Sequence, residues 1–521
     1  MKVISFLKKR IATSFLWLIL TIITFCGRKI AITTSITGRF VYVMSALAAG
    51  RGTTGRPISA AFRTSASLSS STVAAAAADY DVAEVRQSGL LVWPPSPSIV
   101  PQEISIDCGD GIRLAAQSWK QTAQSTTVSA TSRETSGRRI LCLHGWLDNC
   151  RSFHLLAPAL VQGLSSATTM EGGQEEKQML QPPPPPEVVA IDMVGHGWSS
   201  HKSTDGPSVV LAESAYHIAQ VLQKLNWTPA PQAPGQNNDR QNRAKSENEI
   251  AGNGNNSELN DASFNGVNES ESTAAVAGKV TLIGHSFGAA VSCLYAAAFP
   301  DQIDQVVLLD GVGPFSFPSE KIARHVRRHI ERRMISIEKL NSPNNNGPRI
   351  YPSLEVAVRV RCQTARNSPG KQYLSETAAR ELVLRGSRFL DDPNDGDLQQ
   401  GDRRLSFRHD PRLLWPSITY FTPEQSEAVY NDIRTSDCQV CLLRAEDGWP
   451  FFEDEFQESA NPGTPQPITR EQMLALLQPA VCKTLPGSHH FHADPDTAEQ
   501  VAEEVISFLT GSAPTDNQTS K

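Results

Sequence analysis

From about residue 96 onward, the chain alternates between short apolar runs and segments with apolar residues every three or four positions. Runs such as Ile140–Leu143 and Val306–Leu309 are apolar throughout, which is typical of strands buried on both faces of a parallel sheet. Strands that alternate with helices predict an α/β fold with a mostly parallel central sheet and helices on both faces. The expected strands are 104–107, 114–119, 140–143, 188–191, 280–283, 306–309, 438–443 and 481–485, and the expected helices are 153–160, 212–225, 289–299 and 497–509.

Three segments interrupt this alternation. Residues 163–187 are polar and end in five prolines, and residues 229–278 are rich in Asn, Ser, Glu and Gly, so we expect both to be disordered insertions. Residues 315–415 separate two strands and are expected to form a helical lid. The core then comprises residues 96–314 and 416–512, followed by a disordered tail at 513–521.

The first 78 residues have the composition of a targeting presequence, and we expect residues 1–95 to be a presequence or disordered and to lie outside the fold. No Asp or Glu precedes Asp79, whereas ten Lys or Arg do. The apolar run Phe15–Cys26 is shorter than the roughly 20 residues of a membrane span, and fits a signal sequence or a marginal anchor. Residues 44–78 are rich in Ser, Ala, Thr and Arg, like a transit peptide. We therefore expect a mitochondrial, plastid or endomembrane location, with membrane association through the apolar run. One alternative is that Met44 is the true start, which leaves only the segment like a transit peptide. Another is that this region is a disordered tail.

Composition excludes some functional classes. The 521 residues carry a net charge of -6, which predicts neither nucleic acid nor a strongly charged substrate as partner. The nine cysteines show no regular spacing, so a disulfide framework is not expected. Cys438 and Cys441 form one CxxC pair that enters an apolar run, and we interpret them as strand residues.

The motif GHSFG, Gly284–Gly288, follows an expected strand and precedes a helix of small residues. A strand, a tight turn and a helix form a nucleophile elbow, in which the central residue occupies a strained turn and flanking glycines leave room for the crossing. Ser286 is therefore the candidate nucleophile. A chance occurrence of this pattern in a loop is the alternative.

The turn His144-Gly145-Trp146 follows another expected strand. Such a turn supplies one amide of an oxyanion hole, here that of Trp146, and the amide of Phe287 supplies the other. An ordinary glycine turn is the alternative.

A histidine cluster follows the last expected strand. His489, directly after Gly487-Ser488, is the candidate general base, and His490 and His492 are expected to pack or orient. A metal site is the rival interpretation, because His490-x-His492-x-Asp494 resembles part of a metallohydrolase motif, although Pro495 stands where a further histidine is expected.

Two aspartates compete for the role of the acid that orients the base. Asp447 follows the strand 438–443, but the usual acid would fall one position later, on Gly448. Asp310 ends the strand 306–309, and a carboxylate there also reaches the histidine in some proteins with this elbow. Both keep the chain order Ser, Asp, His. We favour Asp310 and keep Asp447 as the alternative.

Several motifs together resemble the serine hydrolase-like proteins, the Kraken-like branch of the α/β hydrolases. They are His144–Asn149 (HGWLDN), Asp192–His201 (DMVGHGWSSH), the elbow, Leu308-Leu309-Asp310, Leu384-Arg385-Gly386, Arg408–Leu413 and Gly487–His492. The resemblance covers about residues 103–512 apart from the insertions. It implies an α/β-hydrolase fold, Ser286 as nucleophile, His489 as base and, since members keep the Leu-Leu-Asp, Asp310 as acid.

These observations predict a serine hydrolase of esters or related acyl compounds, acting through an acyl-enzyme on a small molecule without cofactor or metal. A non-catalytic binding protein and a metallohydrolase are the alternatives. The basic run Lys321–Arg333 in the lid either attracts anionic substrates or a membrane surface, or is a solvated helix face.

Overall fold

A computed structural model describes residues 86–88, 91–121, 137–170, 185–203, 210–229, 279–314, 316, 319–341, 347–390, 403–415, 417, 421–450 and 470–511. All of them belong to one compact unit, Glu84–Lys521. The apolar run 15–26, nearly all of the insertion 229–278 and the tail 513–521 lie outside the described residues, so the predictions made for them stay predictions.

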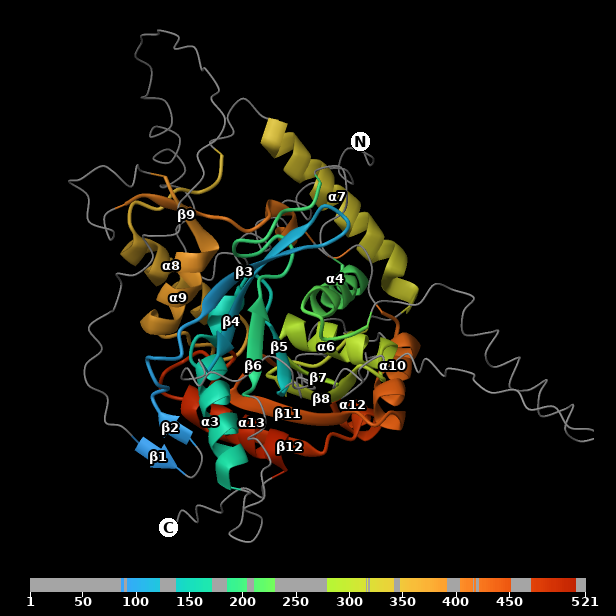
Figure 1. Ribbon diagram of the computed structural model, residues 1–521. Coiled ribbons are helices and arrows are strands. Elements are labelled where there is room, and N and C mark those ends of the chain that lie inside the picture. The colour runs from blue at the N-terminus through green and yellow to red at the C-terminus, as the bar shows by residue number, and fades with distance from the viewer. Residues whose placement is uncertain are drawn as a thin grey trace, which may run out of the picture. The chain divides into compact units, whose positions relative to one another are not determined.

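An eight-stranded sheet forms the centre of the molecule (Figure 1). Its strand order is β12-β11-β8-β7-β5-β6-β4-β3. Six strands run parallel, while β4 is antiparallel to β6 and β3 is antiparallel to β4. The mostly parallel sheet is therefore confirmed. The strands are β3 (Gln102–Asp107), β4 (Arg113–Lys120), β5 (Arg139–Leu143), β6 (Glu187–Ile191), β7 (Val280–His285), β8 (Ile303–Leu309), β11 (Gln439–Asp447) and β12 (Val481–Ser488).

The register of the central strands brings their carboxyl ends together. Leu143 of β5 pairs with Gly284 of β7, and Gly284 pairs with Leu308 of β8. Leu309 of β8 pairs with Leu443 of β11. Residues that follow these strands therefore meet at one edge of the sheet, where parallel sheets bind ligands.

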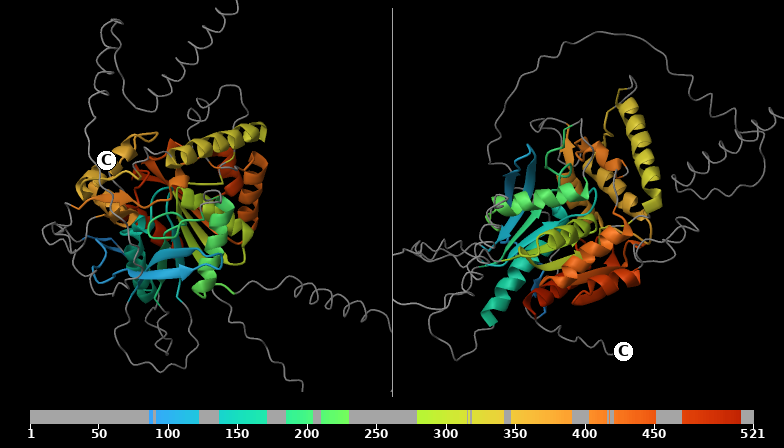
Figure 2. Two further views of the ribbon diagram at one scale, coloured as in Figure 1. Left: turned by 90° about the horizontal axis from the view of Figure 1, so that it is seen from above. Right: turned by 90° about the vertical axis from the view of Figure 1, so that its right-hand side faces the viewer.

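Helices cover both faces of the sheet because alternate strand residues point to opposite sides (Figures 1 and 2). Ile140 and Cys142 pack into one apolar core with α3 and α13. Leu141 and Leu143 pack into the other, with α4, α6 and α10. The helices are α3 (Leu156–Met170), α4 (Leu211–Lys224), α6 (Phe287–Ala298), α10 (Pro423–Thr435), α12 (Arg470–Leu477) and α13 (Ala498–Thr510).

The segment between β8 and α10 forms a helical layer over the carboxyl ends of the strands, with a small apolar core of its own that includes Leu354, Leu382 and Leu405. We call it the lid. Among the described helices, none is both long enough and apolar enough to cross a membrane. The lid elements are α7 (Ile322–Asn341), α8 (Leu354–Arg366), α9 (Glu376–Gly386), β9 (Ser387–Phe389) and β10 (Leu405–Phe407), and β9 and β10 form a two-stranded sheet.

Several predicted boundaries are wrong. The fold does not begin after residue 95, because β1 (Arg86–Ser88) pairs with β2 (Leu91–Trp93) and Leu91 is buried in the core against α3. The insertion does not begin at 163, because α3 continues to Met170. Leu160, Val161 and Leu164 of that helix are buried, so apolar contacts extend it. The last two strands run on to Asp447 and Ser488, past the apolar residues that predicted them.

Candidate active site

Ser286 lies in the turn between β7 and α6. Its backbone φ of 53° is in the region that L-residues rarely adopt, so the predicted strain at the elbow is present. The flanking glycines have a steric reason. A Cβ at Gly284 would lie 2.5 Å from the carbonyl oxygen of Gly288, and a Cβ at Gly288 would lie 2.1 Å from that of Leu143.

The end of β8 packs directly against this elbow. The backbone N–H of Ser286 donates to the carbonyl oxygen of Leu309 at 3.1 Å. A Cβ at Gly311 would lie 2.6 Å from the Cα of Ser286. Asp310, between these two residues, therefore leaves its strand beside the candidate nucleophile.

The carboxylate of Asp310 meets the candidate base. Its Oδ2 lies 2.6 Å from Nδ1 of His489, and the two residues are 1% and 7% exposed. Oδ2 also accepts the backbone N–H of Trp449 at 2.9 Å, and Oδ1 accepts that of Ala445 at 3.1 Å. Backbone donors of this kind stabilise an ionised carboxylate in a buried site.

Asp447 lies elsewhere. Its side chain is 52% exposed and its Oδ1 is 3.8 Å from Nζ of Lys371. The neighbouring Gly448 borders the Asp310 carboxylate, because a Cβ at residue 448 would lie 2.3 Å from Asp310 Oδ1. Of the two candidate acids, the structure thus brings Asp310 to His489.

Backbone contacts hold His489 from two further sides. Nε2 of His285, the residue before the nucleophile, lies 2.7 Å from the carbonyl oxygen of His489. The lid residue Gln372 accepts the N–H of His489 through Oε1 at 3.1 Å and donates through Nε2 to the carbonyl of Gly448 at 2.7 Å. Burial and the adjacent His492 and His489 hold the pKa of His285 well below its usual value, so its ring is neutral.

The oxyanion turn lies against the start of α6. The rings of Trp146 and Phe287 meet edge to face, with centroids 4.9 Å apart. The indole N–H of Trp146 donates to the carbonyl of Leu413 at 3.1 Å, and Leu147 has a φ of 64°. Phe287 is the first residue of α6, and the opening N–H groups of a helix have no acceptor within it. The two residues whose backbone amides are predicted to form the oxyanion hole, Trp146 and Phe287, therefore lie in contact in the fold.

A buried ion cluster lies behind the turn. Asp148 is 3% exposed, and its two oxygens lie 2.6 Å from Nη2 of Arg361 and 3.0 Å from Nε2 of His490. Burial opposes the ionisation of Asp148, but His490 and the Arg361 guanidinium hold the pKa of its carboxyl well below the usual range. Because Arg361 belongs to α8, this cluster links the lid to the oxyanion turn and to the neighbour of the base.

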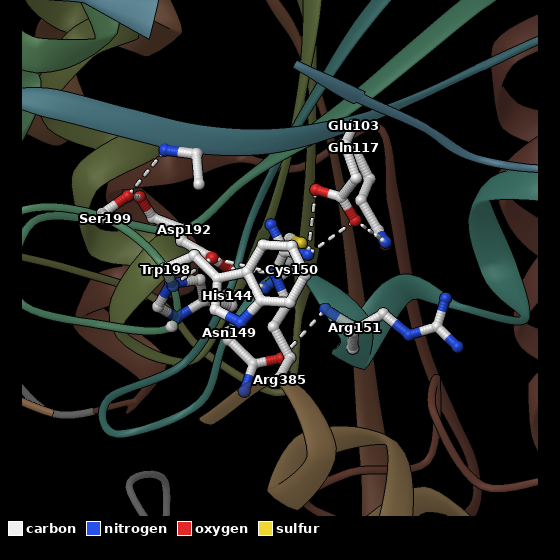
Figure 3. A network of polar contacts seen from close by, with 12 residues as sticks. Glu103, Gln117, His144, Asn149, Cys150, Arg151, Asp192, Trp198, Ser199 and Arg385 are labelled. Atoms are coloured by element: carbon white, nitrogen blue, oxygen red, sulfur yellow. Dashed lines mark hydrogen bonds and ion pairs between the residues drawn. The ribbon is translucent and has the colours of Figure 1, made fainter. Parts of the chain in front are cut away.

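A buried arginine, Arg385, also links the lid to the sheet (Figure 3). Nε of Arg385, on α9, donates to both oxygens of Asp192 at 2.8 and 3.0 Å. Its Nη1 donates to Glu103 of β3 at 2.8 Å, and its guanidinium carbon lies 4.6 Å from the ring centroid of Trp198. Asp192 is fully buried and also accepts the N–H groups of Cys150 and Trp198 at 2.8 Å, so its carboxylate has the hydrogen bonds that a buried charge requires, whereas Nη2 of Arg385 has no hydrogen-bond partner among the described residues.

The C-terminal histidines pack against one another. The ring centroid of His285 lies 4.6, 5.2 and 4.2 Å from those of His489, His490 and His492, respectively. Asp494 accepts the N–H of Ser375 at 3.3 Å. Within the described part of the chain, no group of three or more His, Cys, Asp or Glu side chains is arranged to hold a metal ion. The packing role predicted for His490 and His492 agrees with these contacts.

Sequence reasoning gave no individual role to Asp148, Arg361, Asp192 or Arg385. Three of the four lie in or next to the family-like motifs, and a charged residue inside an otherwise apolar or glycine-rich motif is the signal that marks them. The two cysteines of the CxxC pair are free and buried, at the start of β11 and within it, as predicted for strand residues.

Comparison with known proteins identifies the family of this chain. The model of the alpha/beta hydrolase family matches residues 140–504. A serine hydrolase-like protein of Dictyostelium discoideum is 23% identical over 412 residues, which cover 78% of this chain and 81% of that protein. A probable serine hydrolase of Drosophila melanogaster is 25% identical over 374 residues, covering 71% and 80%. A solved structure of a hypothetical protein from Pseudomonas aeruginosa has 23% identity and a TM-score of 0.48, and covers 78% of this chain and 99% of its own. The chain therefore belongs to the alpha/beta hydrolase family, in its serine hydrolase-like branch.

Proposed function

We propose that this protein is a serine hydrolase that cleaves carboxylic esters or related acyl compounds through a covalent acyl-enzyme. The observation that carries the proposal is the buried contact of 2.6 Å between Asp310 Oδ2 and His489 Nδ1, beside the strained turn of Ser286. A buried carboxylate on Nδ1 leaves Nε2 of the imidazole as the basic nitrogen, which is the tautomer that a general base needs.

The steps follow from these positions. Ser286 Oγ attacks the acyl carbonyl while His489 Nε2 takes its proton, and the amides of Trp146 and Phe287 donate to the developing oxyanion. His489 then protonates the leaving alcohol, and the acyl group stays on Ser286. Water that loses a proton to His489 hydrolyses this ester and releases the acid. Asp310 stays ionised and stabilises the imidazolium in both halves of the reaction.

A fluorophosphonate probe tests the nucleophile. We expect the full chain to be labelled and Ser286→Ala to lose labelling and the hydrolysis of p-nitrophenyl esters together. Ser426→Ala is the matched control, because this buried hydroxyl lies on α10 and has no hydrogen-bond partner among the residues that the structure describes. Labelling that survives in Ser286→Ala, or an unlabelled wild-type chain, would contradict the proposal and favour a non-catalytic binding protein. A series of ester chain lengths measured with the same protein then defines the acyl group.

A further inference from the structure

Helix α7 is unusual among the described elements because its apolar residues face solvent. Fourteen large hydrophobic side chains of the described residues are exposed, and five of them lie on this one helix. An amphipathic surface helix normally buries its apolar stripe against the core. The five are Ile322, Ile330, Met334, Ile335 and Ile337, with exposed fractions of 45%, 49%, 65%, 47% and 42%.

The helix contacts the rest of the lid through a different face. His329 is buried, its ring centroid lies 6.1 Å from that of Trp415, and the guanidinium of Arg333 lies 5.8 Å from the same indole. Ile330, Met334 and Ile337 follow the helical spacing of three and four residues, so they form one stripe beside this contact face. Figure 2 shows α7, in yellow, along an edge of the folded unit in both views.

The charge of α7 opposes that of the whole chain. The helix carries six basic residues and two acidic ones, a net charge of +4, whereas the chain carries -6. Arg324, Arg328 and Arg332 repeat every four residues on the side away from the apolar stripe, a side that also carries Ile335, which follows Arg332 by three residues. Arginine on the polar face and exposed aliphatic residues on the other are the pattern of helices that lie in the headgroup region of a bilayer.

The helix is also connected to the candidate active site. Trp415, which packs on α7, closely follows Leu413, whose carbonyl oxygen accepts the indole N–H of Trp146. Leu414 between them is 64% exposed. A surface that holds α7 therefore lies next to the residues that support the oxyanion turn.

We propose that α7 docks the protein on the surface of an anionic membrane, with Ile330, Met334 and Ile337 in the headgroup region and the arginines on lipid phosphates. This proposal rests on the serine hydrolase function above. Docking through α7 then indicates that the substrates are amphiphilic acyl esters that reach the site from the membrane.

Vesicle sedimentation of the full chain tests the docking surface. We expect binding to vesicles that contain phosphatidylglycerol, weaker binding to pure phosphatidylcholine, and loss of binding as salt rises. Ile330→Ser with Met334→Ser should lower the partition coefficient by about tenfold, and Arg324→Gln, Arg328→Gln and Arg332→Gln together by about a hundredfold. The matched control is Val100→Ser with Ile350→Ser, which removes two apolar side chains that are 68% and 51% exposed outside α7.

Equal sedimentation of all four forms would overturn the proposal, and so would equal binding to both kinds of vesicle. If the serine variants instead dissociate a dimer in sedimentation velocity without lipid, the stripe binds a second copy of the chain and the membrane is rejected. Each sample is also labelled with the fluorophosphonate probe. Because none of the changed residues belongs to the candidate site, labelling that persists while vesicle binding fails separates this proposal from the serine hydrolase function.

Discussion

Asp310 and Asp447 end neighbouring parallel strands, yet their surroundings are opposite. Leu309 and Leu443 are paired in the sheet, so the two strands reach the same edge side by side. Asp310 is 1% exposed and bound to His489, whereas the side chain of Asp447 is 52% exposed and lies near Lys371. A carboxylate at the correct strand end is thus not sufficient, and the path of the backbone decides where it points.

The backbone differs at these two places. Asp310 has a φ of 39°, so the chain turns sharply as soon as β8 ends. β11 continues to Asp447, and the chain turns only at Gly448. The amides of Ala445 and Trp449, on either side of that turn, both donate to Asp310. The end of β11 therefore supplies hydrogen bonds to an acid from the neighbouring strand, and its own aspartate stays in solvent.

The strongest test exchanges each carboxylate for an amide. Asp310→Asn should lower kcat by about 10³–10⁴-fold, because the amide favours the wrong imidazole tautomer and no longer stabilises the imidazolium. Asp447→Asn should stay within about twofold, since it removes only an exposed and distant ion pair. Steady-state kinetics on one ester measures both, with fluorophosphonate labelling as a second readout.

Circular dichroism of both variants is the control for folding. A large loss of activity in Asp447→Asn with little loss in Asp310→Asn would reverse the assignment of the acid, and small effects in both would reject the two candidates.

Buried histidines limit the pH range in which these variants can be compared, because they lower the stability of the fold at acidic pH. Burial lowers the pKa of the fully buried His144 to about 4, and its Nε2 accepts the N–H of Met193. Because an unfolded histidine titrates near 6.5, the neutral ring stabilises the fold fully above that pH, and this contribution is lost as pH falls from 6.5 towards 4. We expect His144 alone to remove about 2 kcal/mol of stability between pH 7 and pH 5.

Urea unfolding at the two pH values measures this loss. His144→Gln should show a smaller difference between them by about the same 2 kcal/mol. An unchanged pH dependence in the variant would mean that His144 is not the group responsible.

The difference between the two strand ends can also be tested by moving the carboxylate from residue 310 to residue 448. Asp310→Gly combined with Gly448→Asp frees the space of the native carboxylate, and glycine tolerates the φ at residue 310. We expect the double variant to have about tenfold higher kcat than Asp310→Gly alone, because part of the tautomer control returns. Gly448→Asp alone should be less active than the wild type, since its Cβ would lie 2.3 Å from Asp310 Oδ1. If the double variant gains nothing, the end of β11 does not direct a side chain toward His489.

Local patterns predicted the sheet, the elbow and the oxyanion turn. In each of these, a strand, glycines and a following helix lie within a few residues, so the signal is complete in one segment. Local patterns favour Asp310 over Asp447 only weakly, because the surroundings that distinguish them include backbone amides 135 and 139 residues away from Asp310.

Other features depended on distant partners and were missed. Arg361 meets Asp148 across 213 residues, and Arg385 meets Asp192 across 193. The strands β1 and β2 follow the targeting-like segment within about 15 residues, and the buried position of Leu91 depends on α3, far along the chain. Such contacts leave no periodic pattern in the sequence.

The two lid arginines that meet buried aspartates have a consequence for how a substrate fits. Withdrawing Arg361 or Arg385 would remove the guanidinium that balances the buried carboxylate of Asp148 or Asp192, and breaking such a pair costs about 3–5 kcal/mol when both partners are fully buried, as Arg385 and Asp192 are. We therefore expect α8 and α9 to behave as a fixed wall and not as a hinged flap. Under the proposed function, the acyl groups that the site accepts should then show a sharp length cut-off, and a rigid receptor is a suitable starting point for fitting inhibitors to the site.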